Sequence, residues 1–150
     1  MYPERFNQYC NGLVNRLTSL RKSILYILWS ANRPLKAYEI LELLLETKIN
    51  AQPPTVYRVL DYFVFAGLVH KVESIQCYTL CQQPEQHLPS ELLMVCNHCH
   101  QVQEVYDNQL RQLFKQITEN SHFNLGQAAI ELKGLCQLCE EQGCLTCQPD

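Results

Sequence analysis

The chain has 150 residues, of which 47% are hydrophobic and 18% charged, a globular composition that excludes wholesale disorder, collagen and coiled-coil arrays. The net charge of -3 divides unequally, because the first 75 residues hold nine Lys and Arg against six Asp and Glu and the remainder hold three against nine. A mildly basic first half suits a polyanion-binding module joined to a second half that does not touch the polyanion. No apolar run approaches the ~18 residues of a membrane helix and no secretory pattern opens the chain, so we expect a cytoplasmic protein.

Three helices are predicted in the first half. Apolar residues recur at every third or fourth position across residues 13–31, with a break expected at Thr18 and Ser19. Residues 35–46 repeat this pattern. A third helix is expected to begin at Pro53 and Pro54, since the first turn has no use for the missing N–H, and to end at Gly67.

The third predicted helix has an apolar and a polar side. Arg58 projects nearly opposite the apolar positions, and Thr55 and Tyr57 flank it. After Gly67, the runs LVHKV and CYTLC surround a polar turn and predict a β-hairpin. Three helices followed by a hairpin is the order of a winged helix-turn-helix domain, which we assign to residues 1–81.

Residues 82–90 carry two prolines and few core-forming residues, so they are interpreted as a linker. Residues 91–150 predict a strand at LLMVC, a strand at QVQEVY, a helix over about residues 107–121, a strand at AAIEL and a cysteine-rich end. Such a small unit exposes a sheet edge and one face, which favours a homodimer. The predicted class is α+β, a winged helix followed by a small C-terminal α/β dimerisation domain.

The chain contains nine cysteines, an unusually high number for a protein of this length. In a reducing compartment they are more commonly metal ligands or redox thiols than disulfides. Cys96 and Cys99 form one C-x2-C pair, and Cys136 and Cys139 form another. Two such pairs, each at the end of a predicted strand, predict a tetrahedral four-thiolate zinc site. A thioredoxin-like role is not favoured, because there C-x-x-C opens a helix inside a larger β/α fold.

Alternative assignments remain for the other cysteines. Cys144 and Cys147 continue the last pair in the pattern C-x2-C-x4-C-x2-C, so four ligands within twelve residues offer a competing zinc site. Cys10 and Cys77 have no assigned role.

Three further potential donors lie near or within the linker, namely His70, Cys81 and His87, and Glu104 follows Cys99 by five residues. Their nitrogen, sulfur and oxygen atoms form a chemically reasonable mixed zinc site. Drawn from both domains, this site would make the domain orientation depend on metal. The spacing of these residues in the sequence would not by itself identify them as zinc ligands.

The motifs PPTVYR (53–58), GLVHKVE (67–73), CNHC (96–99) and CQLC (136–139) resemble those of the ferric uptake regulator family. The family consists of dimeric, metal-responsive DNA-binding repressors with an N-terminal winged helix. The resemblance implies two zinc ions per chain: a structural ion at Cys96, Cys99, Cys136 and Cys139, and a regulatory ion at His70, Cys81, His87 and Glu104.

Iron sensors of the family carry histidines before the first C-x2-C pair and in the last strand. Here those places read SELL and AAIEL, without imidazole, which favours the zinc-sensing branch. The family's LTPQR motif appears as LTSLR (17–21).

On DNA, Arg58 would donate two hydrogen bonds to a guanine, with Tyr57, Thr55 and Tyr38 contacting bases or backbone. The predicted function is a zinc-dependent repressor that binds palindromic operators of zinc-uptake genes in bacteria. No catalytic motif or small-molecule substrate is indicated, so an enzyme is not expected. The alternatives are a family sensor of another metal or of peroxide, and a zinc-ribbon scaffold or thiol protein without specific DNA binding.

Overall fold

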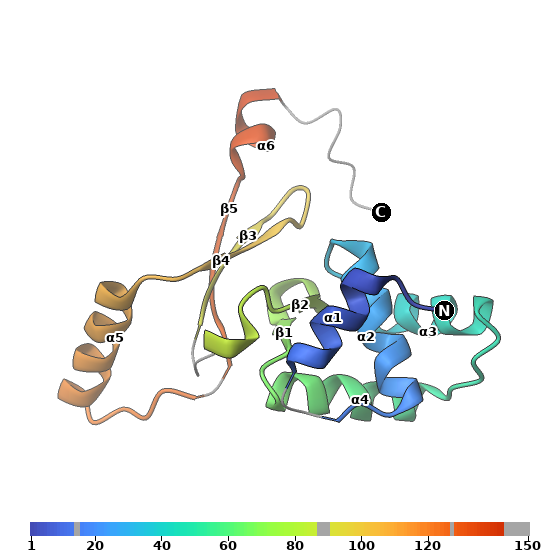
Figure 1. Ribbon diagram of the computed structural model, residues 1–150. Helices are drawn as coiled ribbons and strands as arrows, with labels where there is room; N and C mark the ends of the chain where they lie inside the picture. Colours follow the sequence, from blue (N-terminus) through green and yellow to red (C-terminus); the bar gives the residue numbers. More distant parts are fainter. Residues whose placement is uncertain (14–15, 87–90, 127, 143–150) are drawn as a thin grey trace. The chain divides into compact units, whose positions relative to one another are not determined.

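The computed structural model describes all residues except 14–15, 87–90, 127 and 143–150. The chain divides into two units, Met1–Cys81 and Gln82–Asp150 (Figure 1). Within the described residues, no helix combines the length and the apolar character that crossing a bilayer requires.

The first unit contains the three predicted helices and the predicted hairpin. These elements are α2 (Ser19–Ala31), α3 (Ala37–Glu46), α4 (Pro53–Phe65), β1 (Val69–Val72) and β2 (Cys77–Leu80). The break expected at Thr18 is confirmed, because the Thr18 hydroxyl caps α2 by accepting the Arg21 N–H at 3.4 Å. Gly67 follows α4 at a φ of 73°, a left-handed conformation that glycine adopts without a steric penalty.

A helix that the sequence did not predict, α1 (Glu4–Gly12), packs against α2. Phe6 is its one fully buried residue, and its ring centroid lies 5.0 Å from that of Tyr26 and 5.5 Å from that of Trp29. Lys22 also donates a hydrogen bond to the Asn7 side chain at 2.9 Å. Tertiary contacts therefore hold a segment that has too few apolar residues for a periodic signal.

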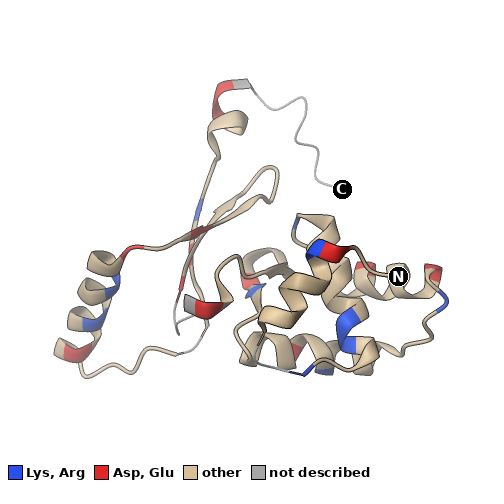
Figure 2. Ribbon diagram, viewed as in Figure 1, with Lys and Arg blue, Asp and Glu red and all other residues tan. Residues whose placement is uncertain are grey.

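The hairpin is joined to the helical core through backbone pairing. Leu35, in the loop before α3, exchanges two hydrogen bonds with Tyr78 of β2 at 2.9 and 2.8 Å. The buried core of the three helices includes Ile24, Leu28, Ile40, Leu44, Val56, Leu60 and Phe63. This packing fixes one side of α4 inside the unit and leaves its opposite side in solvent. Two adjacent basic residues, Arg21 and Lys22, lie in the first turn of α2 (blue in Figure 2).

The described residues of the second unit form a three-stranded sheet with two α-helices and a short 3-10 helix at Pro84–Gln86. Its elements are β3 (Leu92–Cys96), β4 (Val102–Val105), α5 (Asn108–Asn120), β5 (Ile130–Gly134) and α6 (Gln137–Gln142). The strand order is β4-β3-β5, in which β3 pairs antiparallel with β4 and parallel with β5. The strand expected at AAIEL begins two residues later, and α6 lies within the segment predicted only as a cysteine-rich end.

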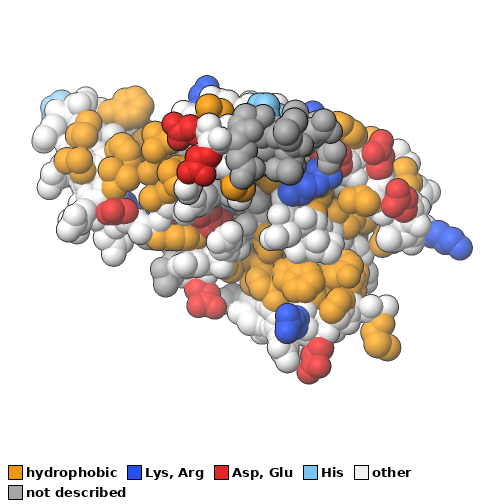
Figure 3. All heavy atoms as spheres, turned by 90° about the horizontal axis from the view of Figure 1, so that it is seen from above, with side chains coloured by type: hydrophobic (Ala, Val, Ile, Leu, Met, Phe, Trp, Pro, Cys, Tyr) orange, Lys and Arg blue, Asp and Glu red, His pale blue; other side chains and the backbone are white. Residues whose placement is uncertain are grey.

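The second unit buries little of its apolar surface. No residue of α5 is buried, although the helix is amphipathic and is capped by Asp107, whose carboxylate accepts the Leu110 N–H at 2.9 Å. Exposed apolar side chains continue along the unit at Leu113, Ile117, Phe123, Leu125, Leu132, Leu135 and Leu138. Hydrophobic side chains accordingly gather at the left of Figure 3, where α5 lies.

Candidate metal-binding sites

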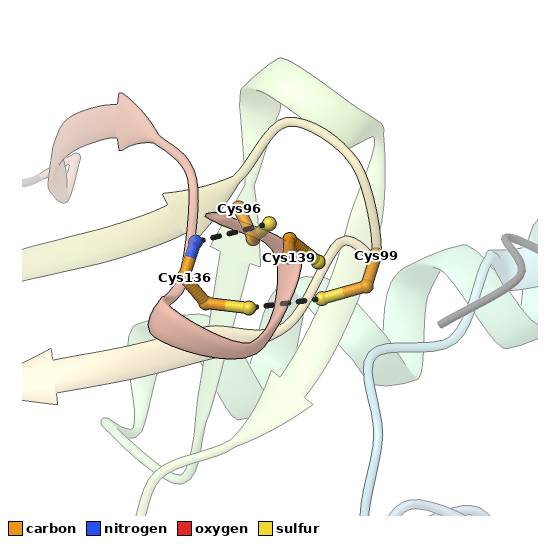
Figure 4. Close-up of side chains that lie close together, drawn as sticks. All are labelled: Cys96, Cys99, Cys136 and Cys139. Atoms are coloured by element: carbon orange, nitrogen blue, oxygen red, sulfur yellow. Dashed lines mark hydrogen bonds between the residues drawn. The ribbon is translucent and has the colours of Figure 1, made fainter. Parts of the chain in front are cut away.

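Four cysteine side chains converge where β3 and β5 end. Cys96 is the last residue of β3, Cys99 follows it in the turn, Cys136 precedes α6 and Cys139 lies within α6. All four sulfurs lie within 4.8 Å of one another, and the sulfurs of Cys99 and Cys136 are 3.7 Å apart (Figure 4). The structure therefore brings together the two predicted C-x2-C pairs.

Parallel pairing of β3 and β5 places the two cysteine pairs at the same end of the sheet. The Asn97 N–H donates to the Gly134 carbonyl at 2.7 Å, which extends this pairing into the first turn. The turn closes when the His100 N–H donates to the Cys96 carbonyl at 3.0 Å, with His100 at a φ of 58°. The Cys136 N–H donates to the Cys96 sulfur at 3.4 Å, so backbone amides of one pair face the thiol of the other.

These backbone donors change how readily the thiols ionise. Burial is the largest single effect on Cys96 and opposes its ionisation. The N–H groups of Cys136, Cys99 and His98, together with a hydrogen bond from the Cys99 side chain, outweigh it and lower the pKa of Cys96 to about 6. Burial raises the pKa of Cys99 to about 11. A bound cation would favour the thiolate form of both.

The spacing of the sulfurs fits zinc. A tetrahedral site with bonds of about 2.3 Å between zinc and sulfur has sulfur–sulfur edges of about 3.8 Å, and the observed 3.7 Å between Cys99 and Cys136 matches this edge. None of the seven described cysteines forms a disulfide. The competing assignment to Cys144 and Cys147 falls on residues outside the described part of the chain.

Two donors of the predicted regulatory site lie together in the first unit. His70 is opposite Thr79 in the β1–β2 register, and Cys81 follows Thr79 by two positions, so both side chains lie on one face of the hairpin. A His70 ring nitrogen and the Cys81 sulfur are within 4.8 Å of each other, and both residues are buried. The Cys81 N–H donates to the Leu68 carbonyl at 2.9 Å, which fixes the position of Cys81 at the end of the hairpin.

In the second unit, Glu104 lies on β4 beside a carboxylate that the sequence prediction missed. Oxygens of Glu91 and Glu104 are within 4.8 Å of each other, and Glu91 is buried. The Tyr106 hydroxyl and the Gln82 N–H both donate to the Glu104 carboxylate, the latter at 3.0 Å. His87, the remaining predicted donor, lies outside the described residues.

The predicted DNA-contacting residues lie on the exposed sides of two helices in the first unit. Arg58 and Tyr57 are exposed on α4, and Thr55 is partly exposed in the first turn of the helix. Tyr38 is exposed near the start of α3, with the Lys36 ammonium 5.9 Å from its ring centroid. The structure therefore leaves all four side chains available to a partner, while Val56, Val59 and Leu60 are buried.

The chain matches one protein-family model and is similar in sequence to known proteins. The model of the ferric uptake regulator family matches residues 13–133. The zinc uptake regulation protein of Escherichia coli K12 is 35% identical over 126 residues, which cover 84% of this chain and 74% of the relative. The ferric uptake regulation protein of Legionella pneumophila is 34% identical over 128 residues, covering 83% and 91% of the two chains.

Solved structures extend this similarity to the fold. A zinc uptake regulator in complex with zinc and DNA superposes with a TM-score of 0.79 at 33% identity, covering 93% of this chain and 94% of the other. The holo form of the regulator XcZur gives a TM-score of 0.75 at 32% identity, with coverage of 89% and 92%.

The geometry of the four cysteines predicts that Cys139→Ser removes one zinc ion per chain and unfolds the second unit in part, because three thiolates hold zinc less tightly and the free energy of metal binding contributes to folding. Zinc content after gel filtration and the circular dichroism spectrum measure both effects. Cys77→Ser is the matched control, since Cys77 is also buried but lies in the first unit. A Cys139→Ser protein with unchanged zinc content would contradict the assignment.

Proposed function

Because the chain belongs to the ferric uptake regulator family, we propose that it is a zinc-dependent transcriptional repressor that binds operator DNA as a homodimer. The observation that carries this proposal is the match, over 93% of the chain, to a zinc uptake regulator in complex with zinc and DNA. When zinc is plentiful, the protein represses zinc-uptake genes in the cytoplasm. This family of transcriptional regulators gives no reason to expect an enzyme.

DNA recognition is assigned to α4. Its buried face anchors the helix in the first unit, and Arg58 and Tyr57 extend from the opposite face. An arginine in the major groove donates two parallel hydrogen bonds to guanine O6 and N7, and the neighbouring Thr55 and Tyr57 supply contacts to thymine methyl groups or phosphates. Tyr38 on α3 adds a base or backbone contact. The excess of basic residues in the first half supports attraction to the phosphate backbone.

Dimerisation is assigned to the second unit. Its sheet ends at β5 on one side and β4 on the other, and α5 has no buried residue among those described. Apolar side chains that include Leu113, Ile117 and Leu132 are exposed in the chain by itself. A second copy that covers this surface would bury it and would present two α4 helices to the half-sites of a palindrome.

Zinc dependence is assigned to the second metal site, so that each chain binds two zinc ions. His70 and Cys81 supply nitrogen and sulfur donors from the first unit, and Glu104 supplies oxygen from the second; the sequence-based set adds His87. A zinc ion held by donors from both units restricts the orientation of one unit against the other. When zinc is scarce, the DNA-binding orientation becomes a minor state and the apparent DNA affinity falls in proportion to its population.

Arg58→Ala should weaken operator binding by about 1–3 kcal/mol per subunit, which is the value of a bidentate contact to guanine. Arg58→Lys keeps the charge but loses the fork geometry, so it should retain non-specific binding and lose discrimination against a changed base. Fluorescence anisotropy with the operator and with a scrambled duplex measures both. The assignment of α4 is wrong if Arg58→Ala binds the operator as tightly as the unaltered protein.

Cys81→Ser should keep the fold and the four-cysteine zinc ion but lose the second zinc ion and zinc-dependent DNA binding, because the hydroxyl of serine is a poor zinc ligand at neutral pH. Zinc content and anisotropy at controlled free zinc are the measurements. Cys10→Ser serves as control, since Cys10 belongs to neither predicted zinc site. Unaltered zinc-dependent binding by Cys81→Ser would rule out this regulatory site.

A further inference from the structure

We propose that Arg21 binds a phosphate of the DNA backbone and that Tyr62 positions Arg21 for this contact, whereas the adjacent Lys22 takes no part. The inference rests on the proposed function and adds to it a pair of residues outside the base contacts assigned to α4. Contacts to phosphates carry no sequence information, but they fix the position and orientation of a protein on the duplex. Arg21 and Tyr62 would therefore align α4 in the major groove.

The Arg21 side chain is held against the ring of Tyr62. The central carbon of its guanidinium group lies 3.6 Å from the centre of that ring, and both residues are half-buried. The ring attracts the cation and restricts its position, while the N–H groups at the edge of the guanidinium remain able to bind a phosphate with two parallel hydrogen bonds. Within the described part of the chain, this stack is the one interaction that the Arg21 side chain makes. No carboxylate neutralises its charge there.

This stack places Arg21 on the exposed side of α4. Tyr62 follows Arg58 by four positions, so the two side chains are neighbours on one side of the helix, about 40° apart around it and about 6 Å apart along it. Asp61, the acidic residue of α4, lies about 60° from Arg58 in the other direction. The backbone of a duplex borders the groove that α4 would enter, so Arg21 would meet phosphates next to the bases that Arg58 contacts.

Lys22 is the next residue of α2 but faces a different helix. Its ammonium group donates a hydrogen bond to the Asn7 Oδ1 at 2.9 Å and lies 5.1 Å from the centre of the Tyr2 ring. Asn7 belongs to α1, and Tyr2 lies just before α1. Successive helical residues point about 100° apart, which directs Arg21 towards α4 and Lys22 towards α1. The two residues thus carry equal charges in one helical turn but have different neighbours.

The test is DNA binding by the full-length, zinc-loaded protein, followed by fluorescence anisotropy at several salt concentrations with an operator duplex and with a scrambled duplex. Arg21→Gln should weaken binding to both duplexes by the same factor, about fivefold per subunit at about 0.15 M salt. This factor follows because one phosphate contact contributes about 0.9 to the slope of log K against log salt concentration. The slope should become shallower by this amount per subunit.

Lys22→Gln is the matched control, because it removes the same charge from the same turn. Its affinity and salt slope should equal those of the unaltered protein. Equal losses in Arg21→Gln and Lys22→Gln would overturn the inference, since long-range charge would then account for both. An unaltered salt slope in Arg21→Gln would also overturn it. Circular dichroism checks the fold of each variant.

The positioning role of Tyr62 has its own test. Tyr62→Leu removes the ring and should weaken binding to both duplexes, but by less than Arg21→Gln, because the charge remains. Tyr62→Phe keeps the ring and should bind as the unaltered protein does. A double variant of Arg21→Gln and Tyr62→Leu should lose no more than Arg21→Gln alone, since Tyr62 acts through Arg21. Losses that add in the double variant would contradict this role.

Arg58→Ala separates this inference from the proposed function. If Arg58→Ala loses its preference for the operator while Arg21→Gln binds both duplexes as tightly as the unaltered protein, only the role of Arg21 is removed. If the unaltered, zinc-loaded protein binds neither duplex, the proposed function itself fails.

Discussion

The second unit depends on the convergence of four cysteine sulfurs, because its sheet buries too few apolar side chains to form a large core. Where the four cysteines meet, the buried cluster is small: it consists of Cys96 and Cys139, with Cys99 and Cys136 packed against it. A structural zinc ion contributes about 10–16 kcal/mol in small metal-dependent domains, which is comparable with the whole stability of an ordinary domain. Metal–thiolate bonds thus stabilise the second unit as side-chain packing stabilises the first, where helices α2 to α4 bury an extensive core.

This difference between the units explains how the proposed regulation can work without unfolding. The first unit has its own core, and the second has its own metal site, so neither needs the regulatory ion to fold. The proposed donors of the regulatory site belong to two small sheets: His70 lies on β1, Cys81 directly follows β2, and Glu104 lies on β4. Zinc at this site would therefore change the population of one domain orientation and leave the structure of each unit intact.

Much of the fold and of the first metal site is predictable from the sequence. Helical periodicity located α2, α3 and α4, and the spacing of the two C-x2-C pairs identified all four thiolates. Local sequence did not reveal α1, because its stability comes from contacts of Phe6 with Tyr26 and Trp29. The proximity of Glu91 to Glu104 was missed for a related reason: Glu91 precedes a strand, belongs to no motif, and comes near Glu104 only through the register of β3 and β4.

The central claim is that the second zinc ion controls DNA binding, and stepwise zinc addition to the metal-free protein tests it most directly. Operator binding, followed by fluorescence anisotropy while zinc content is measured at each step, should stay low through the first equivalent per chain and rise with the second. Operator binding that is complete after the first equivalent, or that does not respond to zinc, would contradict the account.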